Sequence, residues 1–192
     1  MGDPLVDQLE QLIRASSWFM EILRAARDCD PPDWWIGAGV LRDLVWDERH
    51  GGFDPAKVKD VDLAFFDAAD LSRERDLAVE AMLRRRLAAV PWDAKNQAAV
   101  HTWYERRFGF AVPPLQSAAD GVATWPETAT AIAVRLEADD ALLVTASCGL
   151  DDLFHGVWRR NPRRVSVDEY LRRLEAKNVP ARWPLVHVVP VP

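Results

Sequence analysis

Residues 34–67 read WWIGAGVLRDLVWDERHGGFDPAKVKDVDLAFFD, and their first half places two glycines between a short apolar run and an amphipathic one. Gly37 and Gly39 let the backbone turn with positive φ, and they let phosphate oxygens approach the N–H groups at a helix start. The pattern therefore predicts either a phosphate-binding turn between a strand and a helix or an ordinary tight turn. It is not the dinucleotide fingerprint G-x-G-x-x-G, because Arg42 stands where the third glycine is required.

The second half of the stretch holds a pair of aspartates, Asp60 and Asp62, at the start of the apolar run VDLAFF (61–66). Residues i and i+2 of a strand project to one face, so the two carboxylates lie together while Val61 and Leu63 face the other way. Like charges at that separation repel unless a cation lies between them. Paired carboxylates that hold magnesium against substrate phosphates are typical of phosphoryl transfer. The alternative is that one aspartate ends the loop and the other faces solvent.

Composition limits the classes of protein that these motifs can serve. The chain has 192 residues, 49% of them hydrophobic, which predicts a single domain over 1–192 with a full core. Its 24 basic and 30 acidic side chains give a net charge of −6, which disfavours a grip on long nucleic acid. No apolar run approaches the roughly 20 residues of a membrane helix, and the charged N-terminal segment resembles no signal peptide. We therefore expect a cytoplasmic protein without a membrane partner.

Apolar periodicity, caps and turn residues predict helices and strands in alternation. Helices are expected over 4–28, 40–50, 76–90, 96–108 and 166–177, and strands over 34–36, 61–66, 92–95, 130–137 and 141–147. Ser166 and Glu169 have the spacing of a capping box at the start of the last helix. The order predicts an α/β or α+β sheet domain. Cys29 and Cys148 are too few and too isolated for a disulfide framework or a metal site, and both are interpreted as reduced.

Taken together, IGAGVLRDLVW (36–46) and KDVDL (59–63) resemble the G-[GA]-x-x-R-D … D-x-D signature of the DNA polymerase β-like nucleotidyltransferase superfamily, in the form found in CCA-adding enzymes and bacterial poly(A) polymerases. The matching residues are Gly37, Gly39, Arg42, Asp43, Asp60 and Asp62. Residues 34–184 are also similar to a bacterial family of small nucleotidyltransferase-like proteins, through WDAKNQAAVHTWY, TWPETATAIAVRL, GLDDLF and ARWP. The resemblance implies an α+β, polymerase β-type fold with a mixed central sheet flanked by helices. Ala38 at the second glycine position and the insertion ERHGGFDPAKV (48–58) depart from the tRNA enzymes, so their substrate specificity does not carry over.

The superfamily resemblance further implies a third carboxylate on a neighbouring strand, and Asp93 in PWDAKNQ is the candidate. Two metal ions flanking the transferred phosphorus need more ligands than two aspartates supply, and an extra carboxylate can accept the proton of the attacking hydroxyl. Lys95 lies two residues further on and is expected on the same side, within reach of a phosphate, unless it is a solvent-facing strand-end lysine. Glu127 and Asp67 are the alternatives to Asp93.

These inferences predict a nucleotidyltransferase that moves a nucleoside monophosphate from a nucleoside triphosphate to an unknown hydroxyl-type acceptor and releases pyrophosphate. The expected cofactor is Mg²⁺ at a two-ion site, and the acceptor is a small molecule or a protein rather than long nucleic acid. Asp60, Asp62 and Asp93 are the predicted catalytic and metal residues, and Gly37, Gly39, Arg42 and Lys95 the predicted nucleotide-binding residues. The alternative is an inactive nucleotide-binding module or an antitoxin-like module that binds a partner, but the presence of all three carboxylates favours an enzyme.

Several further residues have a structural and a functional interpretation. The basic run at 84–86 is interpreted as a solvated helix face rather than a nucleic-acid clamp. Trp34, Trp92 and Trp103 are interpreted as packing residues rather than base-stacking platforms. The threonines at 124, 128 and 130 flank Glu127 beside a predicted strand, where they serve either as strand-edge residues or as contacts to a ribose or acceptor.

Overall fold

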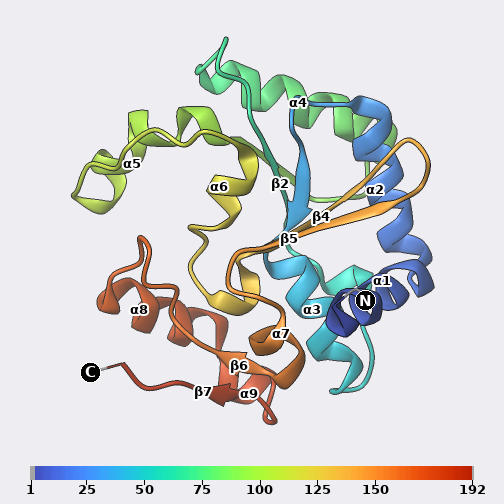
Figure 1. Cartoon of the computed structure of the whole chain (residues 1–192), viewed down its shortest axis with the longest axis vertical. Helices are drawn as coiled ribbons and strands as arrows, with labels where there is room; N and C mark the ends of the chain where they lie inside the picture. Colours follow the sequence, from blue (N-terminus) through green and yellow to red (C-terminus); the bar gives the residue numbers. More distant parts are fainter. Residues whose placement is uncertain (1–2, 192) are drawn as a thin grey trace.

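The computed structural model describes residues 3–191 and is built around a five-stranded mixed sheet (Figure 1). Its strands are β1 (Trp35–Gly37), β2 (Val61–Phe65), β3 (Trp92–Asn96), β4 (Ile132–Leu136) and β5 (Leu142–Ala146). Across the sheet the order is β3-β2-β1-β4-β5, with β2 and β3 parallel and the other neighbours antiparallel. The predicted α+β class, with a mixed central sheet flanked by helices, is confirmed.

The N-terminal segment forms two helices, α1 (Pro4–Ala15) and α2 (Ser17–Cys29), so the prediction of a single helix over 4–28 is wrong. Ser16 interrupts it with extended backbone, at φ −89° and ψ 104°. Its hydroxyl accepts a hydrogen bond of 3.2 Å from the N–H of Phe19 and so caps α2. The break lets both helices pack apolar residues onto the sheet, since Ile13 and Phe19 are fully buried.

The remaining helices connect the strands and close the fold. Between β1 and β3 lie α3 (Gly39–Glu48), the 3₁₀ turn η1 (Pro55–Lys57) and α4 (Arg73–Arg86). Between β3 and β4 lie η2 (Gln97–Ala99), α5 (Val100–Phe108), α6 (Ala118–Val122) and η3 (Thr128–Thr130). After β5 come α7 (Asp151–His155), β6 (Val157–Trp158), α8 (Val167–Lys177), α9 (Val179–Arg182) and β7 (His187–Val188). The parallel pair β6–β7 and the short helices α6, α7 and α9 have no counterpart in the sequence prediction.

The two faces of the sheet pack against two different apolar clusters, a main core and a smaller one. Val61, Leu63 and Phe65 of β2 all belong to the main core, which α1, α2, α3 and α4 help to form. Asp62 falls between them on the opposite face, and Asp93 of β3 lies on the same side as Asp62 by its register. That face meets a smaller apolar cluster formed with α6, and Figure 1 shows α2 and α4 to one side of the strands and α6 to the other. Asp62, Asp93 and Lys95 therefore lie on the face of the sheet that is turned away from the main core.

Within residues 3–191, no helix combines the length and the apolar composition that crossing a membrane requires.

Candidate active site

The predicted carboxylates converge through strand pairing. Asp62 on β2 is the register partner of Asp93 on the parallel strand β3, and of Gly37 on the antiparallel strand β1. Paired residues of neighbouring strands project to the same face, so Asp62 and Asp93 lie side by side. Asp60 precedes β2 by one residue and shares the face of Asp62. The structure thus brings the three predicted carboxylates to one face of the mixed sheet, near the first residues of β2 and β3.

A cavity of about 180 Å³ opens directly over Asp60 and Asp62. Its other walls come from the start of α3, from the loop before η3 and from α8. They are Ala38, Gly39, Arg42, Trp125, Pro126, Thr130, Arg173 and Lys177. We call this the small cavity. The α8 residues Arg173 and Lys177 were missed by the sequence analysis, where the helix was recognised but nothing indicated which of its residues would face the aspartates.

The glycine turn combines close strand packing with an unusual backbone conformation. A Cβ atom on Gly37 would lie 2.2 Å from the carbonyl oxygen of Ile132, so only glycine fits between β1 and β4 at this position. Ala38 has φ 58° and ψ −127°, a region that favours glycine. Its N–H donates to the carbonyl of Ile132 at 3.1 Å, which holds the turn in place. Ala38 and Gly39 line the small cavity at the start of α3, whereas a phosphate contact by Gly37 stays a prediction.

Arg42 is buried, with 2% of its surface exposed, and it has several protein partners. Its Nε and Nη2 atoms donate to Oδ1 of Asp43 at 2.9 and 2.6 Å. The guanidinium also lies 4.6 Å from the ring of Trp183, 5.6 Å from Trp158 and 5.9 Å from Trp46. Arg42 therefore ties α3 to the C-terminal segment while lining the small cavity, and its contact with a nucleotide stays a prediction.

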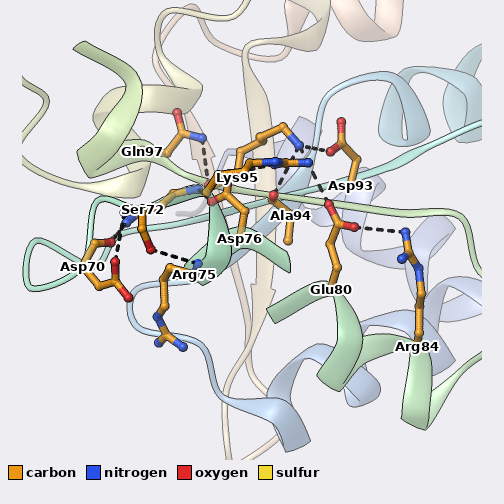
Figure 2. Close-up of polar contacts among 12 residues, drawn as sticks. Asp70, Ser72, Arg75, Asp76, Glu80, Arg84, Asp93, Ala94, Lys95 and Gln97 are labelled. Carbon is orange, nitrogen blue, oxygen red and sulfur yellow. Dashed lines mark hydrogen bonds and ion pairs between the residues drawn. The ribbon is translucent and has the colours of Figure 1, made fainter. Parts of the chain in front are cut away.

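Asp93 is held by a chain of charged side chains (Figure 2). Lys95 donates through Nζ to the carboxylate of Asp93, and its Nζ lies 3.9 Å from Oε1 of Glu80. Glu80 is itself buried and accepts a 3.0 Å hydrogen bond from Arg84. Lys95 therefore faces the same side as Asp93. Arg84 forms an ion pair with Glu80, so the basic run at 84–86 is not only a solvated helix face.

The alternative third carboxylate, Glu127, has a structural role. It is completely buried and accepts two hydrogen bonds from Arg173, of 2.7 and 3.1 Å. The hydroxyl of Thr130 donates to it at 3.0 Å. Asp67 pairs with Arg75 at 2.7 Å. Glu127 thus fixes Arg173 at the wall of the small cavity instead of presenting oxygens to it.

The electrostatics of the carboxylate cluster are those of like charges in a confined site. The pKa of Asp62 is raised from 3.8 to about 7, chiefly by burial and also by the neighbouring charges of Asp60 and Asp93. Lys177 and Lys95 act in the opposite sense. The protein's own cations therefore leave part of the repulsion uncompensated.

The donor set fits a hard dication such as Mg²⁺, which prefers carboxylate oxygens. Asp60 and Asp62 face the small cavity, and the raised pKa of Asp62 marks a position where added positive charge is favourable. In residues 3–191, no group of three or more His, Cys, Asp or Glu side chains has the geometry to hold a metal ion, and Asp93 is paired with Lys95. Asp93 would have to exchange its ion pair with Lys95 for the metal.

A second cavity, of about 500 Å³, is lined by Asp93 and Lys95 but not by Asp60 or Asp62. The two cavities share Trp125, Pro126 and Arg173 in their walls. We call this the large cavity. It includes Thr124, whereas Thr128 hydrogen-bonds to Asp152 at 2.6 Å and lines neither cavity.

Comparison with known proteins and the fold of the mixed sheet together define the class, a polymerase β-like nucleotidyltransferase. A family model described as nucleotidyltransferase matches residues 24–188, so the chain belongs to this nucleotidyltransferase family and is a nucleotidyltransferase. A structure described as a CCA-adding enzyme head domain, solved by NMR, is similar with a TM-score of 0.79 and 27% identity, over 96% of each chain. Among curated proteins, none matches the chain significantly.

Complete CCA-adding enzymes share the fold at lower similarity. The Thermotoga maritima CCA-adding enzyme, solved in complex with tRNA, has a TM-score of 0.58 and 16% identity over 95% of this chain. A CCA-adding enzyme solved with CTP has a TM-score of 0.59, also at 16% identity over 95% of this chain. This chain spans only 42% and 43% of those two enzymes.

Proposed function

We propose that the protein transfers a nucleoside monophosphate from a nucleoside triphosphate to a hydroxyl-type acceptor, with release of pyrophosphate and with a requirement for magnesium. One observation carries the proposal: Asp60 and Asp62 share a single cavity with the Ala38–Gly39 turn and with two cations of α8, Arg173 and Lys177. This supports the proposal, because nucleotidyl transfer requires carboxylates for metal ions and cations for phosphates around one site.

Binding of the triphosphate would use the start of α3 and the cations of α8. Backbone N–H groups at a helix start and the positive end of the helix dipole favour phosphate oxygens. Lys177 and Arg173 add charge from the opposite wall, and the ion pair with Glu127 holds the Arg173 side chain in position. Structures of CCA-adding enzymes with CTP and with ATP support a nucleoside triphosphate as the ligand of this fold.

In the proposed reaction, the oxygen of the acceptor hydroxyl attacks the α-phosphorus, and the bond from that phosphorus to the bridging oxygen of the β-phosphate breaks. Magnesium held by Asp60, Asp62 and Asp93 would polarise the phosphate and lower the pKa of the hydroxyl. Asp93 accepts the proton of the hydroxyl after the ion pair between Asp93 and Lys95 has broken. Lys95 is then available to a phosphate oxygen. The acceptor is a small molecule or a protein, since the net charge of −6 disfavours long nucleic acid.

Calorimetry with ATP, GTP, CTP and UTP, in magnesium and in EDTA, tests the proposal. We expect at least one of the four to bind in magnesium and none to bind in EDTA, because Asp60 and Asp62 repel phosphates that carry no cation. Asp62→Asn should abolish binding, whereas Asp7→Asn, which removes an exposed carboxylate on α1, should leave it intact. Equal binding in EDTA, or binding of none of the four, would refute the assignment of the site.

A further inference from the structure

The large cavity has the dimensions of a small-molecule site and an unusual lining. At about 500 Å³ it lies within the range of roughly 300–1,000 Å³ typical of ligand pockets. Its floor is formed by Asp93 and Lys95, one wall by α5 and Phe110, and the opposite wall by α8 with the residues that precede it. Of the predicted nucleotide-binding residues, Lys95 lines it, whereas Gly37, Gly39 and Arg42 do not. The proposed function uses Asp93 and Lys95 but assigns no ligand to the rest of this cavity.

The position of Asp93 indicates which substrate the large cavity would hold. In phosphoryl transfer the attacking and leaving oxygens lie roughly in line on opposite sides of the phosphorus. The small cavity, with the start of α3 and Lys177, supplies the groups that would hold the triphosphate and its leaving pyrophosphate. Asp93, the proposed proton acceptor, opens into the large cavity instead. The attacking hydroxyl would therefore arrive from the large cavity.

The walls of the large cavity present aromatic rings to solvent. Tyr104 contacts the other three rings of this cluster. Its ring centroid lies 6.0 Å from that of Trp103, 4.5 Å from that of Phe108 and 5.3 Å from that of Phe110. Phe108 and Phe110 are 36% and 42% exposed, which is high for large apolar side chains in one cluster. Such a cluster favours a planar ring, which stacks on aromatic side chains and covers their apolar surface. Trp103, interpreted from the sequence as a packing residue, is part of this surface.

The same cavity carries positive charge that the protein does not neutralise. Three of its cations have acidic partners: Lys95 pairs with Asp93, Arg172 with Glu169 and Arg173 with Glu127. Arg107 and Arg164 have no acidic ion-pair partner within residues 3–191.

Arg164 lacks a hydrogen-bond acceptor for one of its guanidinium nitrogens among the described residues. Its Nη2 donates to the carbonyl of Pro113 at 3.2 Å, but its Nη1 is buried and has no hydrogen-bond partner among the described residues. Its guanidinium carbon lies 5.6 Å from the Tyr104 ring centroid. A buried donor without an acceptor is unfavourable, and a carboxylate or phosphate oxygen beside Nη1 would relieve this. An oxyanion bound there would place the body of the ligand among the aromatic rings.

We infer that the large cavity is the acceptor site, and that the acceptor is a small hydroxyl compound that contains both a planar ring and a carboxylate or phosphate group. The inference rests on the proposed function. The ring lies among Trp103, Tyr104 and Phe110, the oxyanion accepts from Arg164, and the hydroxyl lies beside Asp93. During transfer the hydroxyl oxygen bonds to the α-phosphorus, its proton passes to Asp93 and pyrophosphate leaves.

Calorimetry with two matched pairs of compounds tests the inference and distinguishes a nucleotide from an aromatic acid. The pairs are adenosine 5′-monophosphate with adenosine, and 4-hydroxybenzoate with 4-hydroxybenzyl alcohol. Each is titrated with and without magnesium and a saturating α,β-methylene analogue of ATP, which fills the small cavity without reacting. We expect the anionic member of at least one pair to bind about tenfold or more tightly than its neutral counterpart, because a charge-assisted hydrogen bond from Nη1 of Arg164 to an oxyanion is stronger than one to a neutral hydroxyl.

Variants of two neighbouring arginines locate the binding. Arg164→Gln should weaken the anion about tenfold or more and leave the affinity for the magnesium–ATP analogue within twofold. Arg163→Gln is the matched control, because Arg163 is exposed and does not line the cavity. Tyr104→Leu should weaken both members of a pair, since the ring stacks with either. Thermal unfolding of each variant establishes that it is folded.

Four results would overturn the inference. Equal affinities for the anionic and neutral members of each pair would contradict the proposed contact between the oxyanion and Arg164. Equal effects of Arg164→Gln and Arg163→Gln would contradict it as well. If the Arg164→Gln variant no longer binds the ATP analogue, the large cavity holds the nucleoside of the triphosphate and not the acceptor. Tight tRNA binding at physiological salt that neither anion competes with would indicate a macromolecular acceptor. If no triphosphate binds at all, the proposed function fails, whereas anion binding at Arg164 remains measurable without it.

Discussion

The two faces of β2 and β3 show how one pair of strands serves stability and chemistry at once. On one face Val61, Leu63 and Phe65 are buried in the main core, which α1, α2 and α4 help to form. On the other face Asp62 and Asp93 lie side by side, with Lys95 next along β3. The strand period of two separates these roles completely, because neighbouring residues point to opposite faces. Substitutions on the two faces should therefore have different kinds of effect.

The largest effect is expected on the apolar face, where Phe65→Ala should reduce the free energy of unfolding by about 3–5 kcal/mol. Phe65 is fully buried, so the substitution leaves a cavity that the surrounding helices cannot close. Urea unfolding in the presence of EDTA measures the loss. Phe66→Ala, at a partly buried ring packed against the smaller cluster, is the control and should cost clearly less. Equal losses would contradict the difference between the two faces.

Asp93→Asn should lower turnover by about 10²- to 10³-fold, which corresponds to roughly 3–4 kcal/mol of transition-state stabilisation. Affinity for the magnesium–nucleotide should stay within a few-fold, because Asp60 and Asp62 line the small cavity and Asp93 does not. Asp60→Asn should instead reduce binding and turnover together. Single-turnover assays with labelled triphosphate, combined with calorimetry, separate the two effects. A folded Asp93→Asn protein with full turnover would exclude Asp93 as the third carboxylate.

Asp62→Asn should stabilise the metal-free protein above neutral pH by about 1–3 kcal/mol. The pKa of Asp62 is raised to about 7 by burial and by Asp60 and Asp93, so the unfolded chain loses this proton at lower pH than the folded protein does. The stability that the neutral carboxyl provides is complete below about pH 4 and is lost as the pH rises through about 7. The variant should flatten the stability profile across that window. Urea unfolding from pH 4 to pH 8 in EDTA checks this, and an unchanged slope would show that the pKa of Asp62 is not raised in the folded protein.

The smallest effect is expected at the glycine turn, where Ala38→Gly should stabilise the protein by about 1 kcal/mol. Glycine relieves the backbone strain at φ 58° and ψ −127°, and part of the gain is offset by the greater entropy of the unfolded chain. Ala99→Gly is the control, since Ala99 has an ordinary helical conformation at φ −86° and ψ −11° and should be destabilised by the change. Thermal unfolding compares the two variants. If both are destabilised, strain at Ala38 is not significant.

Much of the site was predictable because its parts are local. The spacing of Asp60 and Asp62 places both carboxylates on one face of a strand, and the spacing of Asp93 and Lys95 does the same on the next strand. The prediction of one long N-terminal helix failed for an equally local reason. The apolar stripe continues through Ser16, but the cap formed by the Ser16 hydroxyl is stronger than the helical pattern at that point.

Local sequence patterns predicted a mixed α and β domain and the residue types of its carboxylate cluster, since helix and strand periods and the glycine turn depend only on neighbours in the chain. The class of protein was predicted from the resemblance of the glycine turn and the D-x-D pair to a known superfamily. Tertiary structure alone decided that β3 pairs in parallel with β2, and hence that Asp93 stands beside Asp62. It also brought Arg173 and Lys177 to the aspartates from a helix more than one hundred residues away, and Arg164 to the ring of Tyr104. The physical reason is that such contacts follow from how apolar faces pack between distant elements, which no local pattern of residues encodes.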